Sequence, residues 1–207
     1  MTQPGLRERK KQATRQRITD VAIALFAERG FESVPVADIA AAADVSPATV
    51  FNYFPAKEDL VYDGMAAFNA SVIDAVRGRP AGTSVVAAFR AHVLQPRGVL
   101  ADPDSPALET LSRVAPIVHA SPSLQARERL EADRATEQLR TLLDRELGVG
   151  DLRAWAAAAA LVGVTRGMVR EVQLAAAEGR VDAAFAERLL AAGEAAVDVV
   201  ERGLRED

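Results

Sequence analysis

The sequence contains no cysteine and only two histidines, His92 and His119, among its 207 residues. The lack of thiols excludes disulfide frameworks, cysteine-ligated zinc, iron–sulfur clusters and thiol nucleophiles. Two histidines are too few for a histidine-rich metal centre, so we expect neither a metal nor a cofactor. Aromatic residues make up 5% of the chain, and we find no convincing strand pattern. Because alanine is abundant and has the highest intrinsic helix propensity, the composition predicts an all-α protein.

Long apolar runs are also absent. The longest uncharged apolar stretch, residues 155–164, has 10 residues, whereas a helix that spans a membrane needs about 18 or more. The first residues are polar and basic, without the following apolar segment that is typical of a secretory signal. We therefore expect a cytoplasmic protein that has no membrane partner.

Charge is distributed unevenly along the chain. The net charge is −4, yet residues 1–17 contain six basic residues and one acidic residue, so this segment carries +5 and the remaining 190 residues carry −9. A basic arm on an acidic body is typical of proteins that bind an anionic polymer such as nucleic acid. The alternative is a solvated, frayed terminus.

The N-terminal part of the chain shows helical periodicity interrupted by clear stop signals. Apolar positions at i, i+3, i+4, i+7 and i+8 over residues 18–26 indicate an amphipathic helix that Gly30 ends. Ser46 is a good N-cap, and Pro47 suits the first position of a helix. We predict four helices, over residues 7–30, 36–43, 47–54 and from about 57 to 78.

Residues 78–84, which are rich in glycine and proline, form the clearest break in the chain, and their composition predicts a domain boundary there. We predict five further helical segments, at about 83–96, 105–119, 123–147, 151–179 and 182–204. Five helices in about 120 residues form a bundle. Pro116 falls inside the second of them and should kink or split it. We expect about nine helices, with one domain at 1–60 and a second at 61–207, joined by the fourth helix.

Residues 36–54 have the dimensions of a helix-turn-helix: a short helix, a three-residue turn and a second short helix. Five residues of the segment are expected to pack inward: Ile39, Ala40, Val45, Val50 and Phe54. The outer face of the second helix then consists of Ala48, Thr49, Phe51, Asn52 and Tyr53. This face is uncharged and begins with small residues, which suits a helix end inserted into a major groove. The alternative is that Phe51 and Tyr53 are core aromatic residues of a small bundle.

Over about residues 12–62 the sequence resembles the tetracycline-repressor (TetR) family of bacterial transcription regulators. The resemblance rests on Arg17-Ile18, the run 24–31, the segment 36–40, Val45-Ser46 and the run 50–60. It implies a homodimer of all-helical subunits that bind a palindromic double-stranded operator through three N-terminal helices. It also implies a C-terminal bundle that binds a small, largely apolar effector, and a repressor that this effector releases from DNA.

The resemblance assigns DNA binding to eight residues: Arg17, Ser46, Ala48, Thr49, Phe51, Asn52, Tyr53 and Lys57. We expect Tyr53 and Lys57 on phosphates and Thr49 and Phe51 on base edges. Three positions depart from the family pattern. Asp44 stands where the turn usually has glycine, Pro35 stands where a threonine often caps the second helix, and Phe51 replaces a frequent tyrosine.

The C-terminal region offers candidates for an effector pocket and for a dimer interface. The pocket candidates are Phe89, His92, Val93, Val114, Ile117, Val118, His119, Trp155 and Met168. Any one of them, taken singly, is more often a core residue. The last two helices carry a wide apolar face that we expect at the dimer interface, with Phe185, Leu189, Gly193, Val197 and Val200. The alternative is that this face belongs to the core of one subunit.

Two other classes of function remain open. The first is an enzyme. The sequence contains no glycine-rich phosphate loop, no nucleophile elbow and no pair of metal ligands at helical spacing, so we do not expect catalytic activity. A DNA-binding dimer that needs no effector would keep the N-terminal unit. It would have no cavity in the C-terminal bundle.

Overall fold

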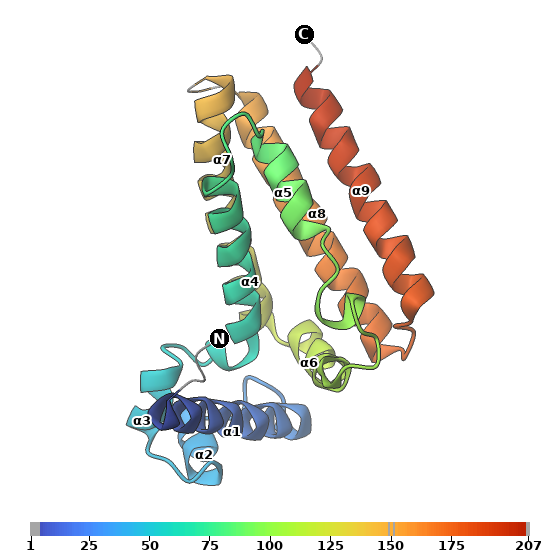
Figure 1. Ribbon diagram of the computed structural model, residues 1–207. Coiled ribbons are helices and arrows are strands. Elements are labelled where there is room, and N and C mark those ends of the chain that lie inside the picture. The colour runs from blue at the N-terminus through green and yellow to red at the C-terminus, as the bar shows by residue number, and fades with distance from the viewer. Residues whose placement is uncertain (1–4, 149, 151, 206–207) are drawn as a thin grey trace. The chain divides into compact units, whose positions relative to one another are not determined.

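The computed structural model describes residues 5–148, 150 and 152–205, and for residues 63–66 the backbone alone (Figure 1). The described residues form nine α-helices and one 3-10 helix, with no strand among them. The elements are α1 (Leu6–Arg29), α2 (Val36–Ala42), α3 (Pro47–Tyr53), α4 (Asp59–Arg77), α5 (Val85–Val93), η1 (Gly98–Leu100), α6 (Pro106–Ala120), α7 (Pro122–Leu147), α8 (Leu152–Ala177) and α9 (Ala183–Arg205). The all-α prediction is confirmed, and each predicted helix is present within a few residues.

The chain divides into two compact units. The first comprises Met1–Asp63 together with Pro116–Arg127, and the second comprises Gly64–Ala115 together with Glu128–Asp207. The glycine- and proline-rich break at 78–84 therefore lies within the second unit, where it forms the turn between α4 and α5. Helix α6 continues through Pro116, so the expected split does not occur. Proline costs this helix one backbone hydrogen bond at that point.

The core of the first unit is formed by α1, α2 and α3. Ile18, Phe26, Ile39, Val50 and Phe54 are at most 1% exposed. They occupy the apolar positions of three amphipathic helices, which is why the periodicity of the sequence predicted both the helices and their inner faces.

The turn between α2 and α3 reverses the chain within three residues. Asp44 adopts a left-handed conformation with φ of +53°. The Val45 N–H donates to the Ala40 carbonyl at 3.0 Å, and the Asp44 N–H donates to the Ala41 carbonyl at 3.2 Å. These two bonds are those of a Schellman motif, which usually has glycine at the left-handed position. Asp44 fills that position because aspartate tolerates the conformation better than most residues do.

The α6–α7 junction is bound to the rest of the first unit by polar contacts. The hydroxyls of Ser121 and Ser123 donate to the Glu32 carboxylate at 2.7 and 3.0 Å, and the Ser123 N–H donates to it at 3.2 Å. The hydrogen bond from Ser121 is the main reason that the pKa of Glu32 is lowered. The Tyr62 hydroxyl donates to the Leu124 carbonyl at 3.1 Å. The carboxylate therefore satisfies donors at the start of α7.

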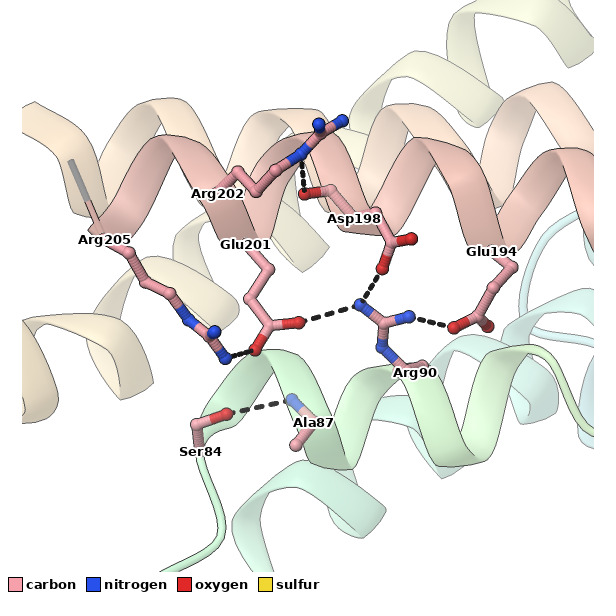
Figure 2. Close-up of polar contacts among 8 residues, drawn as sticks. All are labelled: Ser84, Ala87, Arg90, Glu194, Asp198, Glu201, Arg202 and Arg205. Atoms are coloured by element: carbon pink, nitrogen blue, oxygen red, sulfur yellow. Dashed lines mark hydrogen bonds and ion pairs between the residues drawn. The ribbon is translucent and has the colours of Figure 1, made fainter.

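In the second unit, α5 and α9 are joined by a cluster of charged groups. Figure 2 shows the Arg90 guanidinium of α5 between three carboxylates of α9. It donates to Asp198 at 2.7 Å, to Glu201 at 2.8 Å and to Glu194. Arg205 donates to Glu201 from one turn further along α9. The carboxylates are spaced at i, i+4 and i+7, so that one face of α9 surrounds a single guanidinium.

Beneath these charges, the apolar face of α9 packs into the core of its own subunit. Phe185, Leu189 and Val197 are at most 8% exposed, and all three belong to the core cluster of the second unit. A Cβ atom at Gly193 would lie 2.8 Å from atoms of Leu94 and Met168, so glycine permits close packing here. No helix among the described residues is long and apolar enough to cross a membrane.

Candidate functional site

The short helix α3 begins at a well-formed N-cap. The Ser46 hydroxyl oxygen accepts from the Thr49 N–H at 3.1 Å and lies 2.8 Å from the Thr49 hydroxyl oxygen. Pro47 follows at the first helical position, where its missing N–H costs nothing. The cap therefore fixes both the start of α3 and the orientation of the Thr49 side chain.

The outer face of α3 is solvent-accessible, as its residue pattern predicted. Ala48, Phe51 and Asn52 are exposed, whereas Thr49 and Tyr53 are partly buried. The Phe51 side chain is 49% exposed, which is unusual for a large apolar residue. Phe51 is therefore not a core aromatic residue, and its exposed ring is available for an apolar contact with a partner.

A basic groove lies beside this face. It has a volume of about 720 Å³ and is lined by Arg7, Glu8, Lys10, Lys11, Thr14, Thr49, Asn52 and Tyr53. Arg7, Lys10, Lys11 and Thr14 are spaced at i, i+3, i+4 and i+7, so they share one side of α1. The described part of the basic arm is helical from Leu6 onward. The groove thus combines three cations with polar side chains of α3.

Arg15 and Arg17 lie on the same helix but have different roles. Arg15 donates to the Tyr53 carbonyl at 3.1 Å, and its guanidinium carbon lies 4.4 Å from the centre of the Phe54 ring. It therefore fixes the end of α3 against α1. Arg17 is exposed, but it is not among the residues that line the groove.

The Lys57 side chain contacts the loop that follows α1. Its ammonium donates to the Phe31 carbonyl at 2.5 Å and lies 4.3 and 5.6 Å from the centres of the Phe31 and Phe26 rings. Burial lowers the pKa of Lys57, although Glu32 and Glu58 act in the opposite direction. In the chain without DNA, this hydrogen bond attaches the Lys57 side chain to the loop after α1 and stabilises that loop.

The departure at Pro35 is also visible. Pro35 is the N-cap of α2, and it provides no side-chain hydrogen bond there. A threonine at this position would offer a hydroxyl both to the helix and to a phosphate. This chain therefore lacks that contact.

A second candidate site is a cavity of about 340 Å³ within the second unit. It is lined by Phe68, Val93, Gln95, Arg97, Gly98, Val99, Leu100, Ala107, Leu111, Thr165, Met168, Val169, Val172 and Gln173. Its size lies at the lower end of the range for small-molecule sites. Of the nine residues that we expected around an effector, Val93 and Met168 line this cavity.

The other seven expected residues do not line it. Phe89 is a core residue at 1% exposure, and the Trp155 side chain is 55% exposed on the surface. Ile117, Val118 and His119 belong to the first unit. Val114 and His92 are partly buried, and neither is among the lining residues. Amphipathic spacing places apolar residues inside a bundle, but it does not distinguish a cavity wall from a filled core.

His92 does not line the cavity, but it contacts Phe68 and Arg97, which do. Its Nε2 lies 2.9 Å from the Ser71 hydroxyl and 3.1 Å from an Arg97 nitrogen, and its ring stacks against Phe68 at 6.3 Å between centres. Burial, and then the Arg97 charge, lower the pKa of His92 below its ordinary value of 6.5. The imidazole is therefore neutral at pH 7, and Nε2 accepts the Arg97 hydrogen bond.

The residues that we expected at the dimer interface lie elsewhere. Phe185, Leu189, Gly193 and Val197 are buried and Val200 is partly buried, all within the subunit. This is the intramolecular alternative. The large apolar side chains that remain exposed on α8 and α9 are Leu152, Trp155 and Val199.

The first unit has the geometry of a helix-turn-helix, and the comparisons with known proteins find the same type of domain in this segment. Residues 18–62 match the family model of bacterial regulatory proteins of the tetR family. The HTH-type transcriptional regulator TcmR of Streptomyces glaucescens is 36% identical over 86 residues, which are 42% of this chain and 38% of that protein. The HTH-type transcriptional regulator LuxR of Vibrio harveyi is 53% identical over 47 residues, or 23% of each chain.

The likeness to solved structures extends over most of the chain. NalD, the secondary repressor of the MexAB-OprM multidrug efflux pump in Pseudomonas aeruginosa, has a TM-score of 0.56 at 18% identity, covering 91% of this chain and 97% of NalD. GusR of Salmonella enterica has a TM-score of 0.51 at 21% identity, covering 96% and 98%. At these identities the likeness shows the fold. The similarity to the tetR family in sequence is thus located in the N-terminal domain, over residues 18–62.

Proposed function

We propose that this chain is a homodimeric transcriptional repressor that acts in the cytoplasm and leaves a palindromic operator when a small molecule binds it. The single observation that carries the proposal is the basic groove between residues 7–14 and the exposed face of α3. Helix α3 itself lies inside the segment that matches the tetR family. The TcmR and LuxR relatives are named transcriptional regulators, and NalD is named a repressor. The chain spans less than two fifths of the length of either curated relative. The proposed function of the whole protein therefore depends on the groove and the cavity of this chain, and not on the functions of these relatives.

In this proposal α3 enters the major groove of DNA and the basic arm follows the phosphate backbone. Thr49, Phe51 and Asn52 contact base edges, and the Phe51 ring makes an apolar contact with a thymine methyl group. Arg7, Lys10 and Lys11 contact phosphates, and these contacts supply most of the affinity that does not depend on sequence. Ser46, Ala48 and Tyr53 complete the surface, and Arg17 lies beyond its edge.

The dimer in this proposal uses the exposed sides of the last two helices. Small residues at 156, 160, 163 and 167 follow one exposed stripe of α8, beside Trp155. On α9 a second exposed stripe consists of Arg188, Ala191, Ala195 and Val199. Small residues allow two helices to approach closely, and Trp155 and Val199 supply apolar area for a partner. A two-fold dimer matches a palindromic operator.

The cavity favours a ligand-responsive regulator over a dimer that needs no effector. Helix α4 belongs to the first unit up to Asp63 and to the second unit from Gly64, and Phe68 of this helix lines the cavity. A ligand that shifts α4 therefore acts directly on the segment that follows α3. A hundred-fold loss of operator affinity requires a preference of about 2.7 kcal/mol for the released state.

The test is a gel-shift titration with duplexes that the protein selects from a random pool. A repressor of this type enriches an inverted repeat, and the bound species has the mass of a dimer. Phe51→Ala should relax the base preference at matching positions of both half-sites. Binding without any sequence preference would contradict the proposed role of α3.

A further inference from the structure

The walls of the cavity in the second unit are mainly apolar and carry one charge. Phe68, Val99, Leu111, Met168 and Val172 are typical of its lining. Arg97 is the one charged residue among the described residues that line it. A ligand inside would therefore meet a positive group and no carboxylate.

Arg97 is held in place but is not neutralised. Its guanidinium donates to His92 Nε2 at 3.1 Å, to the His92 carbonyl at 2.7 Å and to the Gln95 side-chain oxygen at 3.1 Å. Its central carbon lies 5.4 Å from the centre of the Phe68 ring. These three acceptors are neutral, and Arg97 forms no ion pair with any residue in the described part of the chain. A guanidinium has five N–H donors, so two of them remain for a ligand.

Gln173 provides a second polar group in the same lining. Its side chain is 4% exposed, and it forms no hydrogen bond with the residues that the structure describes. Its amide atoms are not among the fully buried side-chain atoms that lack a partner, so the amide is accessible from the cavity. An unpaired amide in a cavity wall is therefore a donor and acceptor that a ligand can satisfy.

We propose that the cavity binds a small apolar monoanion, whose carboxylate or phenolate oxygen pairs with Arg97 and whose second polar group meets Gln173. This inference rests on the proposed function in that this ligand would be the effector. Charge-assisted hydrogen bonds are about twice as strong as neutral ones. The cavity should therefore prefer an anion to a neutral molecule of the same shape.

The experiment compares three probes that share one ring system. Calorimetry with the full chain measures the affinities for 2-naphthoate, 2-naphthamide and 6-hydroxy-2-naphthoate. We expect 2-naphthoate to bind at least 10-fold more tightly than 2-naphthamide. Arg97→Gln should remove this preference, and Arg97→Lys should retain most of it because the charge remains. Arg129→Gln, which removes an exposed arginine of α7 outside the cavity lining, should leave the preference unchanged.

Two further variants locate the site. Leu111→Trp fills the cavity and should abolish binding of all three probes. Gln173→Met should remove any advantage of 6-hydroxy-2-naphthoate over 2-naphthoate while keeping the preference for the anion. Equal affinity for acid and amide would overturn the proposal, as would a preference that survives Arg97→Gln or the absence of any binding.

Operator binding by the same samples separates this inference from the proposed function. If the protein binds operator DNA but takes up none of the probes, the ligand class is wrong and the DNA-binding role stands. If 2-naphthoate binds in an Arg97-dependent manner without changing operator affinity, the ligand class stands and the coupling to DNA is wrong.

Discussion

Salt dependence of DNA binding offers a sharp test of the basic groove. The chain has three lysines, and all of them lie in the first unit: Lys10, Lys11 and Lys57. Lys10 and Lys11 are exposed in the groove beside α3, whereas the Lys57 ammonium is bonded to the Phe31 carbonyl. Replacing Lys10 and Lys11 together by glutamine should remove two phosphate contacts from each protomer. The same change at Lys57 should remove none.

The expected size follows from counterion release. Each lost contact reduces the slope of log affinity against log salt by about 0.9, so the double variant of a dimer should lose about 3.6 from its slope. Between about 50 and 200 mM salt, the affinity ratio of parent to variant should then shrink by roughly 100-fold.

Fluorescence anisotropy with a labelled operator, measured across that salt range, provides both slopes. Lys57→Gln serves as the matched control. It should keep the slope of the parent and lower the unfolding free energy by about 1–2 kcal/mol, because one hydrogen bond and two ring contacts are lost. An unchanged slope for the double variant, or a slope reduced by about 0.9 per protomer for Lys57→Gln, would refute this assignment.

Three further predictions concern stability and assembly. Asp44→Gly should raise the free energy of unfolding and Asp44→Ala should lower it, each by roughly 0.5–1 kcal/mol in urea titrations, because position 44 is left-handed; an unchanged midpoint for both would contradict the strain argument. Trp155→Glu should give a folded monomer in light scattering, whereas Leu189→Arg should unfold the subunit because it buries an unpaired charge; a Trp155→Glu dimer would refute the interface. Because the pKa of His92 is lowered by burial and by Arg97, the unfolded chain binds more protons there, so stability should fall as pH drops below about 6.5. His92→Gln should reduce this loss in thermal melts, and an identical pH profile would contradict the neutral imidazole.

The helices of this protein were predictable because their signals are local. Gly30 ends α1, Ser46 and Pro47 start α3, and apolar residues recur at helical spacing between these points. The faces of α3 followed from the same spacing, since Val50 and Phe54 point to the core and leave Phe51 outside. Local chemistry thus determined both helix α3 and its exposed surface.

The burial of α9 within its own subunit and the cavity were not predictable because they depend on which helices become neighbours. The spacing around Leu189 shows that α9 has an apolar side. It does not show that α5 and α8 of the same chain cover that side. In the same way, Gln173 lies in an otherwise ordinary helical stretch, and only tertiary packing places it in the wall of a cavity. Lys57 follows the family motif, yet its ammonium is bonded to a carbonyl 26 residues away.

The most direct test of the account is selection of duplexes by the full-length protein, followed by footprinting with the parent and with Phe51→Ala. The account predicts an inverted repeat that one dimer protects, and a base preference that changes in both half-sites when Phe51 is replaced, with a loss of about 1–3 kcal/mol at the affected base pairs. A pool without an enriched sequence, or a footprint and base preference that Phe51→Ala leaves unchanged, would contradict it.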